Sequence, residues 1–263
     1  MNIIDAIKAR RSVRSYVGDP LTPEQEQLLR DAIGNVIDPF GGNVTIRLKS
    51  FDMRDGYKPS TYGMIKGAVN FFLLGVGSDE TSALSAGYCF EQVVLRAQEI
   101  GLGTCWIAGT FKGGDFNRDE QWPGGQDLKI ISPVGVPAQT RILEKVGRKV
   151  MGSDKRKPFS ELFFTDDFRQ SLSPDSHFGK PMEMMRLAPS STNSQPWRAL
   201  VDDHTVHFYY VPKSALSVLD CGIALCHFHF VENYLNRSGR FFTSPAAPAP
   251  PSNWRYLISF CEE

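Results

Sequence analysis

The sequence is poor in cysteine, has no long apolar run and has no excess charge of either sign. Its 263 residues include five cysteines, an odd number at irregular spacing and without a Cys-x-x-Cys pair. This pattern argues against a disulfide framework, and we expect the cysteines to be small core residues. Lysine plus arginine equals aspartate plus glutamate at 29 each, so no net field attracts nucleic acid or an anionic membrane. We therefore expect neither as a partner.

Signals for export and for several enzyme classes are also missing. No segment approaches the ~20 uninterrupted apolar residues of a transmembrane helix, and residues 1–5 do not begin a signal peptide, so we expect a cytoplasmic protein. There is no Gly-x-Gly-x-x-Gly sequence, no Walker A sequence and no nucleophile elbow. His227 and His229 lie two residues apart on a predicted helix and point about 200° apart, so we expect no metal site there.

What is present indicates a globular chain. Hydrophobic residues make up 41% and charged residues 22%, and the length is enough for one large domain or two half-size domains. Thr22, followed by Pro23 and two glutamates, is a strong helix start. Apolar patterning predicts helices over 2–11, 22–33, 82–100, 181–187 and 218–237, and strands over 44–51, 68–76, 128–134, 205–211 and 256–261.

These segments recur in the same order in the two parts of the chain. A shift of 135 residues places 71–76 on 206–211 and carries Gly87 onto Gly222 without a gap. Earlier in the chain the shift is 156, which indicates an insertion in the first half at roughly 52–67. The spacing predicts an internal duplication, although an unrelated α/β chain with similar spacing stays an alternative.

We expect three regions in the chain. These are a first half over 1–136, a basic connecting segment over 137–180 and a second, shorter half over 181–263. A connection of about 40 residues without clear elements is long for a compact domain, so we expect it to be functional or to wrap the surface.

Four short segments carry the chemical signal. Residues 9–16 are Ala-Arg-Arg-Ser-Val-Arg-Ser-Tyr, and residues 188–197 are Ala-Pro-Ser-Ser-Thr-Asn-Ser-Gln-Pro-Trp. Residues 101–109 are Gly-Leu-Gly-Thr-Cys-Trp-Ile-Ala-Gly, and residues 155–158 are Lys-Arg-Lys-Pro. Taken singly, they also suit an exposed helix end, a polar turn, a helix C-cap and a solvated linker. In combination they resemble the FMN-dependent nitroreductase family.

In ordinary members of that family the Ser-Ser-x-Asn segment follows the first two helices, and the flavin lies between two subunits. Here the two flavin-contacting segments lie more than 170 residues apart in one chain. The arrangement is similar to the subfamily in which one chain has two pseudo-symmetric halves. The resemblance implies a nitroreductase-like α+β fold, with a mostly antiparallel central sheet flanked by helices and two pseudo-repeated halves that mimic a dimer. Because each segment occurs once, it also implies a single flavin site.

The resemblance assigns residues to the parts of FMN, whose phosphate needs cations, whose N1–C2=O edge needs a positive group and whose N5 needs a polar contact. It places Arg14 at the N1–C2=O edge and the backbone N–H of Ala108 or Gly109 at N5. Ordinary members often have a glutamate at the position of Ala108, which puts the choice of acceptor in doubt. The phosphate and ribityl chain fall to Arg10, Arg11, Ser12 and Arg156, other contacts to Pro189, Ser190, Ser191, Asn193 and Gln195, and a loosely aligned ring contact to Tyr62.

The implied activity is that of an FMN-dependent NAD(P)H oxidoreductase with a ping-pong order. NADH or NADPH reduces the flavin, and a nitroaromatic, a quinone or a similar small-molecule acceptor reoxidises it. No catalytic side chain is expected beyond Arg14 as an electrostatic stabiliser, and no metal. A fused dimer makes a monomer sufficient and does not forbid a homo-oligomer. Two alternatives stay open: a flavin-binding protein without turnover that serves as a sensor or store, and a flavin enzyme of other chemistry, such as a dehalogenase or a flavin-cleaving enzyme.

Overall fold

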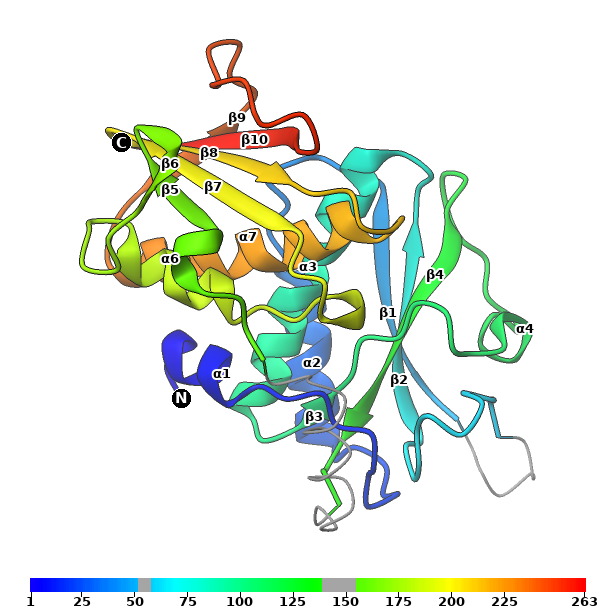
Figure 1. Cartoon of the computed structure of the whole chain (residues 1–263). Helices are drawn as coiled ribbons and strands as arrows, with labels where there is room; N and C mark the ends of the chain where they lie inside the picture. Colours follow the sequence, from blue (N-terminus) through cyan, green and yellow to red (C-terminus); the bar gives the residue numbers. More distant parts are fainter. Residues whose placement is uncertain (52–57, 139–154) are drawn as a thin grey trace.

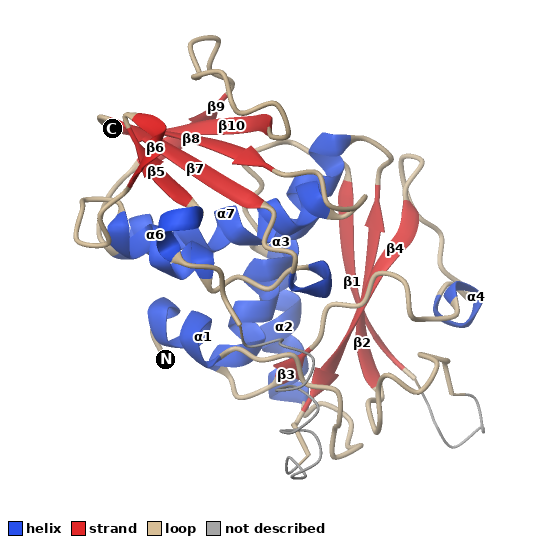
Figure 2. Ribbon diagram, in the orientation of Figure 1, coloured by secondary structure: helices blue, strands red, loops and turns tan. Residues whose placement is uncertain are grey.

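A layer of helices separates two sheets in the computed structural model of the chain, which describes residues 1–51, 58–138 and 155–263 (Figures 1 and 2). The first part of the chain contains α1 (Ile3–Ala9), α2 (Pro23–Gly34), β1 (Val44–Ser50), β2 (Asn70–Val76), α3 (Glu80–Glu99), β3 (Gly103–Thr104), α4 (Gly113–Phe116) and β4 (Asp127–Gly135). The second part contains the 3-10 turn η2 (Phe159–Glu161), β5 (Phe163–Thr165), β6 (Asp167–Ser171), α6 (Gly179–Arg186), η3 (Ser191–Asn193), β7 (Trp197–Asp202), β8 (Thr205–Tyr210), α7 (Ser217–Tyr234), β9 (Gly239–Phe242) and β10 (Arg255–Glu262).

Every helix and strand predicted from the sequence is present, with ends displaced by no more than three residues. The predicted cap at Thr22 is confirmed, because its hydroxyl accepts the N–H of Gln25 while the Gln25 side chain accepts the N–H of Thr22. α3 begins earlier than predicted, because the Asp79 side chain caps it by accepting the N–H of Ser82.

The two sheets share one topology. The first has the order β1-β2-β4-β3, the second contains the order β7-β8-β10-β9, and all neighbours within these two sets of four are antiparallel. β5 and β6 extend the second sheet beyond β7, where β5 runs parallel to β7. The expectation that 137–180 has no clear elements is therefore wrong for its described part, because these two short strands lie within it. The mostly antiparallel α+β architecture is confirmed, with the sheet repeated.

The two halves meet where α3 and α7 cross. A Cβ on Gly87 would lie 2.0 Å from the carbonyl oxygen of Leu219, and a Cβ on Gly222 would lie 2.1 Å from that of Leu84. Each contact becomes the other when 135 is added to or subtracted from the residue numbers. The crossing is therefore locally two-fold, and only glycine at both positions allows the two backbones to approach so closely.

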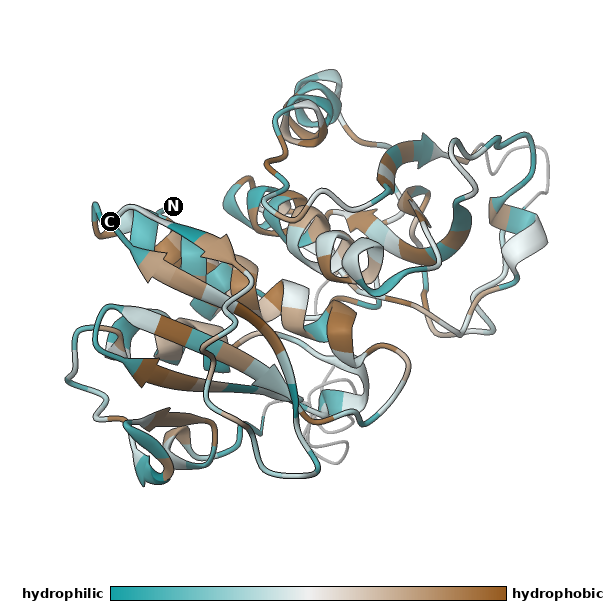
Figure 3. Cartoon of the chain, turned by 90° about the horizontal axis from the view of Figure 1, so that it is seen from above, coloured by the Kyte–Doolittle hydropathy of each residue, from teal (hydrophilic) through white to brown (hydrophobic). Residues whose placement is uncertain are grey.

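A large apolar core joins both halves of the chain. It includes Phe72 and Phe90 from the first half and Trp197, Phe208 and Phe228 from the second, all of them buried. Hydrophobic residues gather on the strands and central helices, and hydrophilic ones on the peripheral loops (Figure 3). Within the described ranges, no helix has both the length and the apolar character needed to cross a membrane.

Candidate functional site

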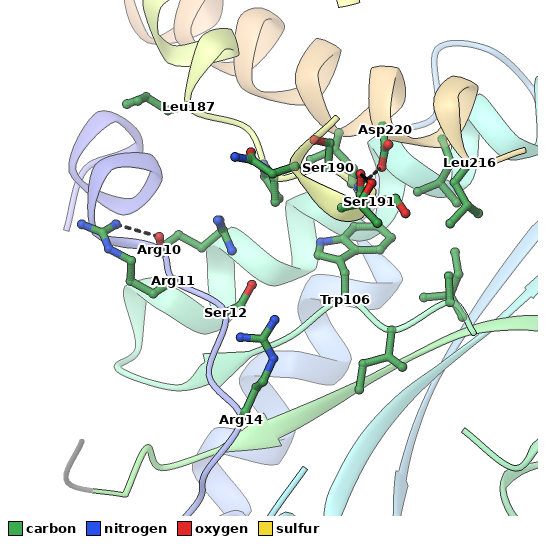
Figure 4. Close-up of a pocket in the computed structure, with 18 of the residues that line it drawn as sticks. Arg10, Arg11, Ser12, Arg14, Trp106, Leu187, Ser190, Ser191, Leu216 and Asp220 are labelled. Carbon is green, nitrogen blue, oxygen red and sulfur yellow. Dashed lines mark hydrogen bonds between the residues drawn. The ribbon is translucent and has the colours of Figure 1, made fainter. Parts of the chain in front are cut away.

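A cavity of about 960 Å³ lies between the two halves, at one side of the α3–α7 crossing. Four segments contribute most of its wall: 7–14, 106–110, 187–193 and 216–223. The first two belong to the N-terminal half and the last two to the C-terminal half. Figure 4 shows Arg10, Arg11, Ser12 and Arg14 on one wall and Ser190, Ser191 and Asp220 on another, with Trp106 between them.

The structure brings all but two of the predicted cofactor-binding residues to this cavity. Tyr62 is absent from the lining, and its side chain is 66% exposed two residues before Met64, which does line the cavity. Gln195 is also absent from the lining and is buried. The residues that do line the cavity are Arg10, Arg11, Ser12, Arg14, Ala108, Gly109, Arg156, Pro189, Ser190, Ser191 and Asn193.

The cationic wall is formed where the chain leaves α1. Arg10 ends the helix, and its N–H donates to the carbonyl of Ala6. The following residues run alongside β3, where the N–H of Val13 donates to the carbonyl of Thr104 over 2.9 Å. Gly103 makes this approach possible, because a Cβ there would lie 2.6 Å from a methyl group of Val13. The strand β3 thereby fixes the direction of Ser12 and Arg14.

Arg10 is unusual among the cations of this wall, because only 6% of its surface is exposed. Its Nε lies 3.9 Å from a carboxylate oxygen of Glu91 and has no hydrogen-bond partner among the described residues. Burial lowers the pKa of Arg10, and the Glu91 carboxylate partly offsets that effect. A buried guanidinium with an unused N–H is a site for an anionic ligand.

The opposite wall is the turn at 190–195, which is held in a strained conformation. Thr192, Asn193 and Gln195 have φ values of 50°, 56° and 47°, in the left-handed region that residues other than glycine seldom adopt. Each such residue costs on the order of 1–3 kcal/mol unless its surroundings impose the conformation. Here the N–H of Ser191 donates to the Asp220 carboxylate over 2.9 Å, and the N–H of Gln195 donates to the hydroxyl of Ser190.

Two polar side chains anchor this turn to the basic segment. The Gln195 side chain accepts the N–H of Lys157 and donates to the carbonyl of Asn193. The Asn193 amide donates to the carbonyl of Lys155 over 2.8 Å, and Arg156 donates to the Asn193 side chain and to the carbonyl of Leu187. The Gln195 side chain therefore stabilises the turn by hydrogen bonds within the protein. The basic segment at 155–158 lies against the Ser-Ser-x-Asn segment at 190–193.

The third wall is the segment after β3. The Trp106 ring packs edge-on against Phe90 with centroids 4.7 Å apart, and its Nε1 donates to the Glu91 carboxylate. Ile107 forms a bridge with Ile131 of β4, which fixes the residues that follow. Ala108 and Gly109 are exposed, and their N–H groups make no hydrogen bond within the described part of the chain.

Sequence reasoning missed Asp220, the one carboxyl among the lining residues in the described ranges. It is 2% exposed, and burial raises its pKa to about 7 despite the hydrogen bonds from Ser191 and Ser194. It also missed the apolar residues of α7, Leu219 and Ile223, which face the cavity. No local signal marks these positions, because α7 is apolar over almost its whole length and the cavity-facing side cannot be identified from its pattern alone.

A family model described as "Putative TM nitroreductase" matches residues 2–231. A crystal structure described as a putative nitroreductase from Thermotoga maritima MSB8 is 21% identical with a TM-score of 0.61, and the match covers 100% of this chain and 93% of that chain.

Two further solved structures resemble the chain less closely. One is an FMN-dependent nitroreductase from Clostridium difficile R20291, 17% identical with a TM-score of 0.43, covering 52% of this chain and 89% of that chain. The other is a nitroreductase with bound FMN from Bacteroides fragilis NCTC 9343, 15% identical with a TM-score of 0.42, covering 54% of this chain and 91% of that chain. No curated protein sequence matches the chain.

Proposed function

The chain belongs to the family described as "Putative TM nitroreductase", and from this premise we propose that it is an FMN-dependent NAD(P)H oxidoreductase. NADH or NADPH is the electron donor, and a nitroaromatic, a quinone or a similar small molecule is the acceptor. The observation that carries the proposal is the meeting of two distant segments. Arg10 to Arg14 and Ser190 to Asn193 face one cavity from opposite halves of the chain, in agreement with the flavin-contacting segments of the resemblance.

The residues present fit FMN on their own chemistry. The cavity volume of about 960 Å³ lies at the upper end of the ordinary range for small-molecule sites. Its lining includes the cations Lys8, Arg10, Arg11, Arg14 and Arg156, as an anionic phosphate needs. The buried Nε of Arg10 has no hydrogen-bond partner in the described structure, although Glu91 lies 3.9 Å away, and such a donor suits a phosphate oxygen.

We assign the phosphate end to Arg10, Arg11, Ser12 and Arg156. Arg14 lies further along the same wall and places a positive charge where negative charge develops at the N1–C2=O edge. The exposed N–H groups of Ala108 and Gly109 are the donors for N5. We assign the opposite side of the FMN site to Pro189, Ser190, Ser191 and Asn193. Gln195 acts indirectly, through the turn that it stabilises. Tyr62 is kept as a contact at the edge of the cavity, beside Met64.

The bound cofactor supplies the redox chemistry, and the chain supplies binding, orientation and charge. Arg14 and the neighbouring donors favour electron uptake by holding positive charge at one edge of the cavity. Trp106, Leu219 and Ile223 give the cavity an apolar side against which an aromatic ring can pack. No side chain is needed as a general acid or base, because the acceptor can take its proton from water.

We propose that the divisions 1–136, 137–180 and 181–263 mark two pseudo-dimeric halves and their connection. The half-site opposite the cavity lacks the residues that bind flavin. The loop from 35 to 42 stands where the second half has its Ser-Ser-x-Asn turn, and Ser85 stands at the position of Asp220 under the shift of 135. Phe40, Tyr88 and Phe241 pack against one another in that region. One flavin per chain follows, and a monomer suffices.

The first test is whether the purified protein contains or takes up FMN, followed in the visible absorbance spectrum. Arg10→Ala should weaken FMN binding by roughly 100-fold, because it removes a buried charged donor. Arg30→Ala is the matched control, since Arg30 is an exposed arginine paired with Glu26 on α2, outside the cavity. A colourless protein that takes up no added FMN contradicts the proposal.

A second test separates an oxidoreductase from a flavin store. FMN-loaded protein is mixed anaerobically with NADH or with NADPH in a stopped-flow instrument. We expect rapid bleaching of the flavin band, followed by its return when a quinone or nitroaromatic is added. Flavin that binds tightly but stays oxidised with both donors shows that the protein binds FMN without turnover.

A further inference from the structure

A buried polar cluster lies directly behind the cationic wall of the cavity. Glu91 of α3 is its centre, and both Glu91 and His227 of α7 have no exposed surface. One Glu91 oxygen lies 2.9 Å from Nε2 of His227 and 3.9 Å from Nε of Arg10. The other oxygen accepts the N–H of Trp106 over 2.9 Å. Two residues of the cavity lining, Arg10 and Trp106, are thus connected through a single carboxylate.

The hydrogen bonds of the cluster fix the number of its protons. Nδ1 of His227 lies 3.0 Å from the carbonyl oxygen of Met184, and a carbonyl only accepts, so Nδ1 bears a hydrogen. The contact between Nε2 and Glu91 needs one further proton between the two groups. The contacts of Glu91 with Arg10 and with the Trp106 N–H suit a carboxylate, so we infer from this geometry that the proton lies on His227, as an imidazolium. Arg10, His227 and Glu91 together then have a net charge of +1.

The pseudo-symmetry of the chain provides a comparison for this cluster, because the equivalent positions on the other side of the crossing lack it. Under the shift of 135 that relates Gly87 to Gly222, Glu91 corresponds to Cys226 and His227 corresponds to Gln92. The same pair of helices therefore packs on the other side of the crossing without a buried ion pair. Burying such a pair costs free energy, and a packed apolar pair is often equal or better for stability. Of these two equivalent positions at the crossing of α3 and α7, the charged pair occupies the one beside the cavity.

We propose that His227 and Glu91 are positioning residues that hold Arg10 and Trp106 against the cavity. They give the cationic wall the positive charge that selects a phosphorylated flavin over an unphosphorylated one. This inference deepens the proposed function and rests on it. Glu91 prevents Arg10 from being an isolated buried cation before the ligand arrives. His227 neutralises Glu91, so that the carboxylate does not repel the phosphate that Arg10 binds.

Two substitutions separate charge from shape. His227→Gln puts the residue found at the equivalent position of α3 into α7 and removes one positive charge, which makes the cluster neutral. Glu91→Gln keeps the net charge at +1, because the His227 ring then becomes neutral. The amide that Glu91→Gln introduces can donate to the bare Nε2 of His227 while its oxygen accepts the Trp106 N–H. His229→Gln is the matched control, since His229 lies on the same helix and bonds Tyr88 outside the cavity.

The dissociation constants of FMN and riboflavin are measured for each protein by titration calorimetry. We expect His227→Gln to weaken FMN roughly ten-fold while riboflavin changes by less than about two-fold. Glu91→Gln and His229→Gln should leave the ratio of the two constants near that of the wild type. Equal weakening of both ligands by His227→Gln overturns the proposal. The proposal is also overturned if Glu91→Gln lowers the preference for FMN, the dissociation constant of riboflavin divided by that of FMN, as much as His227→Gln does.

A spectroscopic measurement decides the protonation state without any flavin. In ¹⁵N-histidine-labelled wild-type protein at neutral pH, both ring nitrogens of His227 should show the shifts of an imidazolium. In Glu91→Gln they should show the neutral tautomer with hydrogen on Nδ1. A neutral His227 in the wild type overturns the inference even if FMN binds. If instead the wild type has the imidazolium but binds neither flavin, the proposed function fails, and the selection of phosphate fails with it.

Discussion

Asp220 is a residue of the cavity lining whose burial costs free energy when its carboxyl is ionised. Its carboxyl is 2% exposed and accepts hydrogen bonds from Ser191 and Ser194, but no cation opposes the effect of burial on its pKa among the described residues. A buried carboxyl without an ion-pair partner is costly when it is ionised. The hydrogen bonds that Asp220 accepts hold the strained turn at 190–195 opposite the cationic wall, and this contribution to the site offsets the cost.

The stability of the protein should therefore depend on pH through Asp220. Its pKa is about 7 in the folded chain against an ordinary value of 3.8. A carboxyl whose pKa is raised by folding contributes stability that is complete below the unfolded pKa and is lost as the pH rises through the folded pKa. Between pH 4 and pH 8 this loss is on the order of 4 kcal/mol. Asp220→Asn should remove it, which urea unfolding at several pH values measures.

Glu232 provides a matched comparison for that experiment. It is fully buried outside the cavity lining, and burial raises its pKa to about 7 as well. Glu232→Gln should flatten the same part of the pH profile without altering FMN binding, and the two variants should add. Wild-type and Asp220→Asn profiles that run parallel from pH 4 to pH 8 contradict the argument.

At the residue scale, the sequence predicted site residues that belong to short motifs, and it did not single out residues whose partners lie far away along the chain. Arg10, Arg14 and Ser190 belong to short segments whose residue types match a ligand directly. Asp220 and Glu91 have hydrogen-bond partners that lie 29 and 136 residues away along the chain. Gln195 shows the converse case, because its motif predicted a ligand contact and its side chain is used within the protein.

Among the elements, α3 and α7 depend on two glycines. A side chain on Gly87 meets the Leu219 carbonyl and one on Gly222 meets the Leu84 carbonyl, and backbone cannot move aside as a flexible side chain can. Gly87→Ala and Gly222→Ala should each lower the free energy of unfolding by about 3 kcal/mol or more. The double variant should cost less than the sum, because one separation of the helices relieves both contacts.

Gly34→Ala is the control for these two substitutions. Gly34 is the last residue of α2, and a Cβ there meets nothing within 4 Å, so alanine should be neutral or stabilising by up to about 1 kcal/mol. Thermal or urea unfolding of the wild type and the four variants measures the differences. If Gly87→Ala is as stable as Gly34→Ala, the close crossing of α3 and α7 is wrong.

The elements that sequence patterns identified are those with strong local signals. Thr22 and Gln25 form a capping box, and β2 is a continuous apolar run. The strands that were missed lack such signals. β5 has three residues and β9 has four, and Arg198 interrupts the apolar pattern of β7 although it is buried over the Trp254 ring. Their pairing in the second sheet, rather than their own composition, makes them strands.

At the scale of the whole molecule, the cavity is assembled from both halves of one chain. Residues 7–14 and 187–193 are the two sides that the family resemblance assigns to different subunits. Both are present here in a covalent unit that shares one core. The duplication could be predicted from the shift of 135 residues, whereas the site between the halves required the crossing of α3 and α7 in three dimensions.

This arrangement predicts one FMN per chain, with an affinity that does not change as the protein is diluted. In a site built between separate subunits, dilution would dissociate the walls and release the flavin. Here the walls stay at a fixed effective concentration because one chain and one core connect them.

Sedimentation velocity followed in the flavin absorbance band, at several protein concentrations, should show FMN on the monomer with a ratio of FMN to chain near one. Arg10→Ala should lower that ratio, in line with its roughly 100-fold weaker binding, because each chain has a single cationic wall of this kind in its described part. Two flavins per chain, or flavin found only on a dimer, would mean that the second half-site or a partner chain completes the binding.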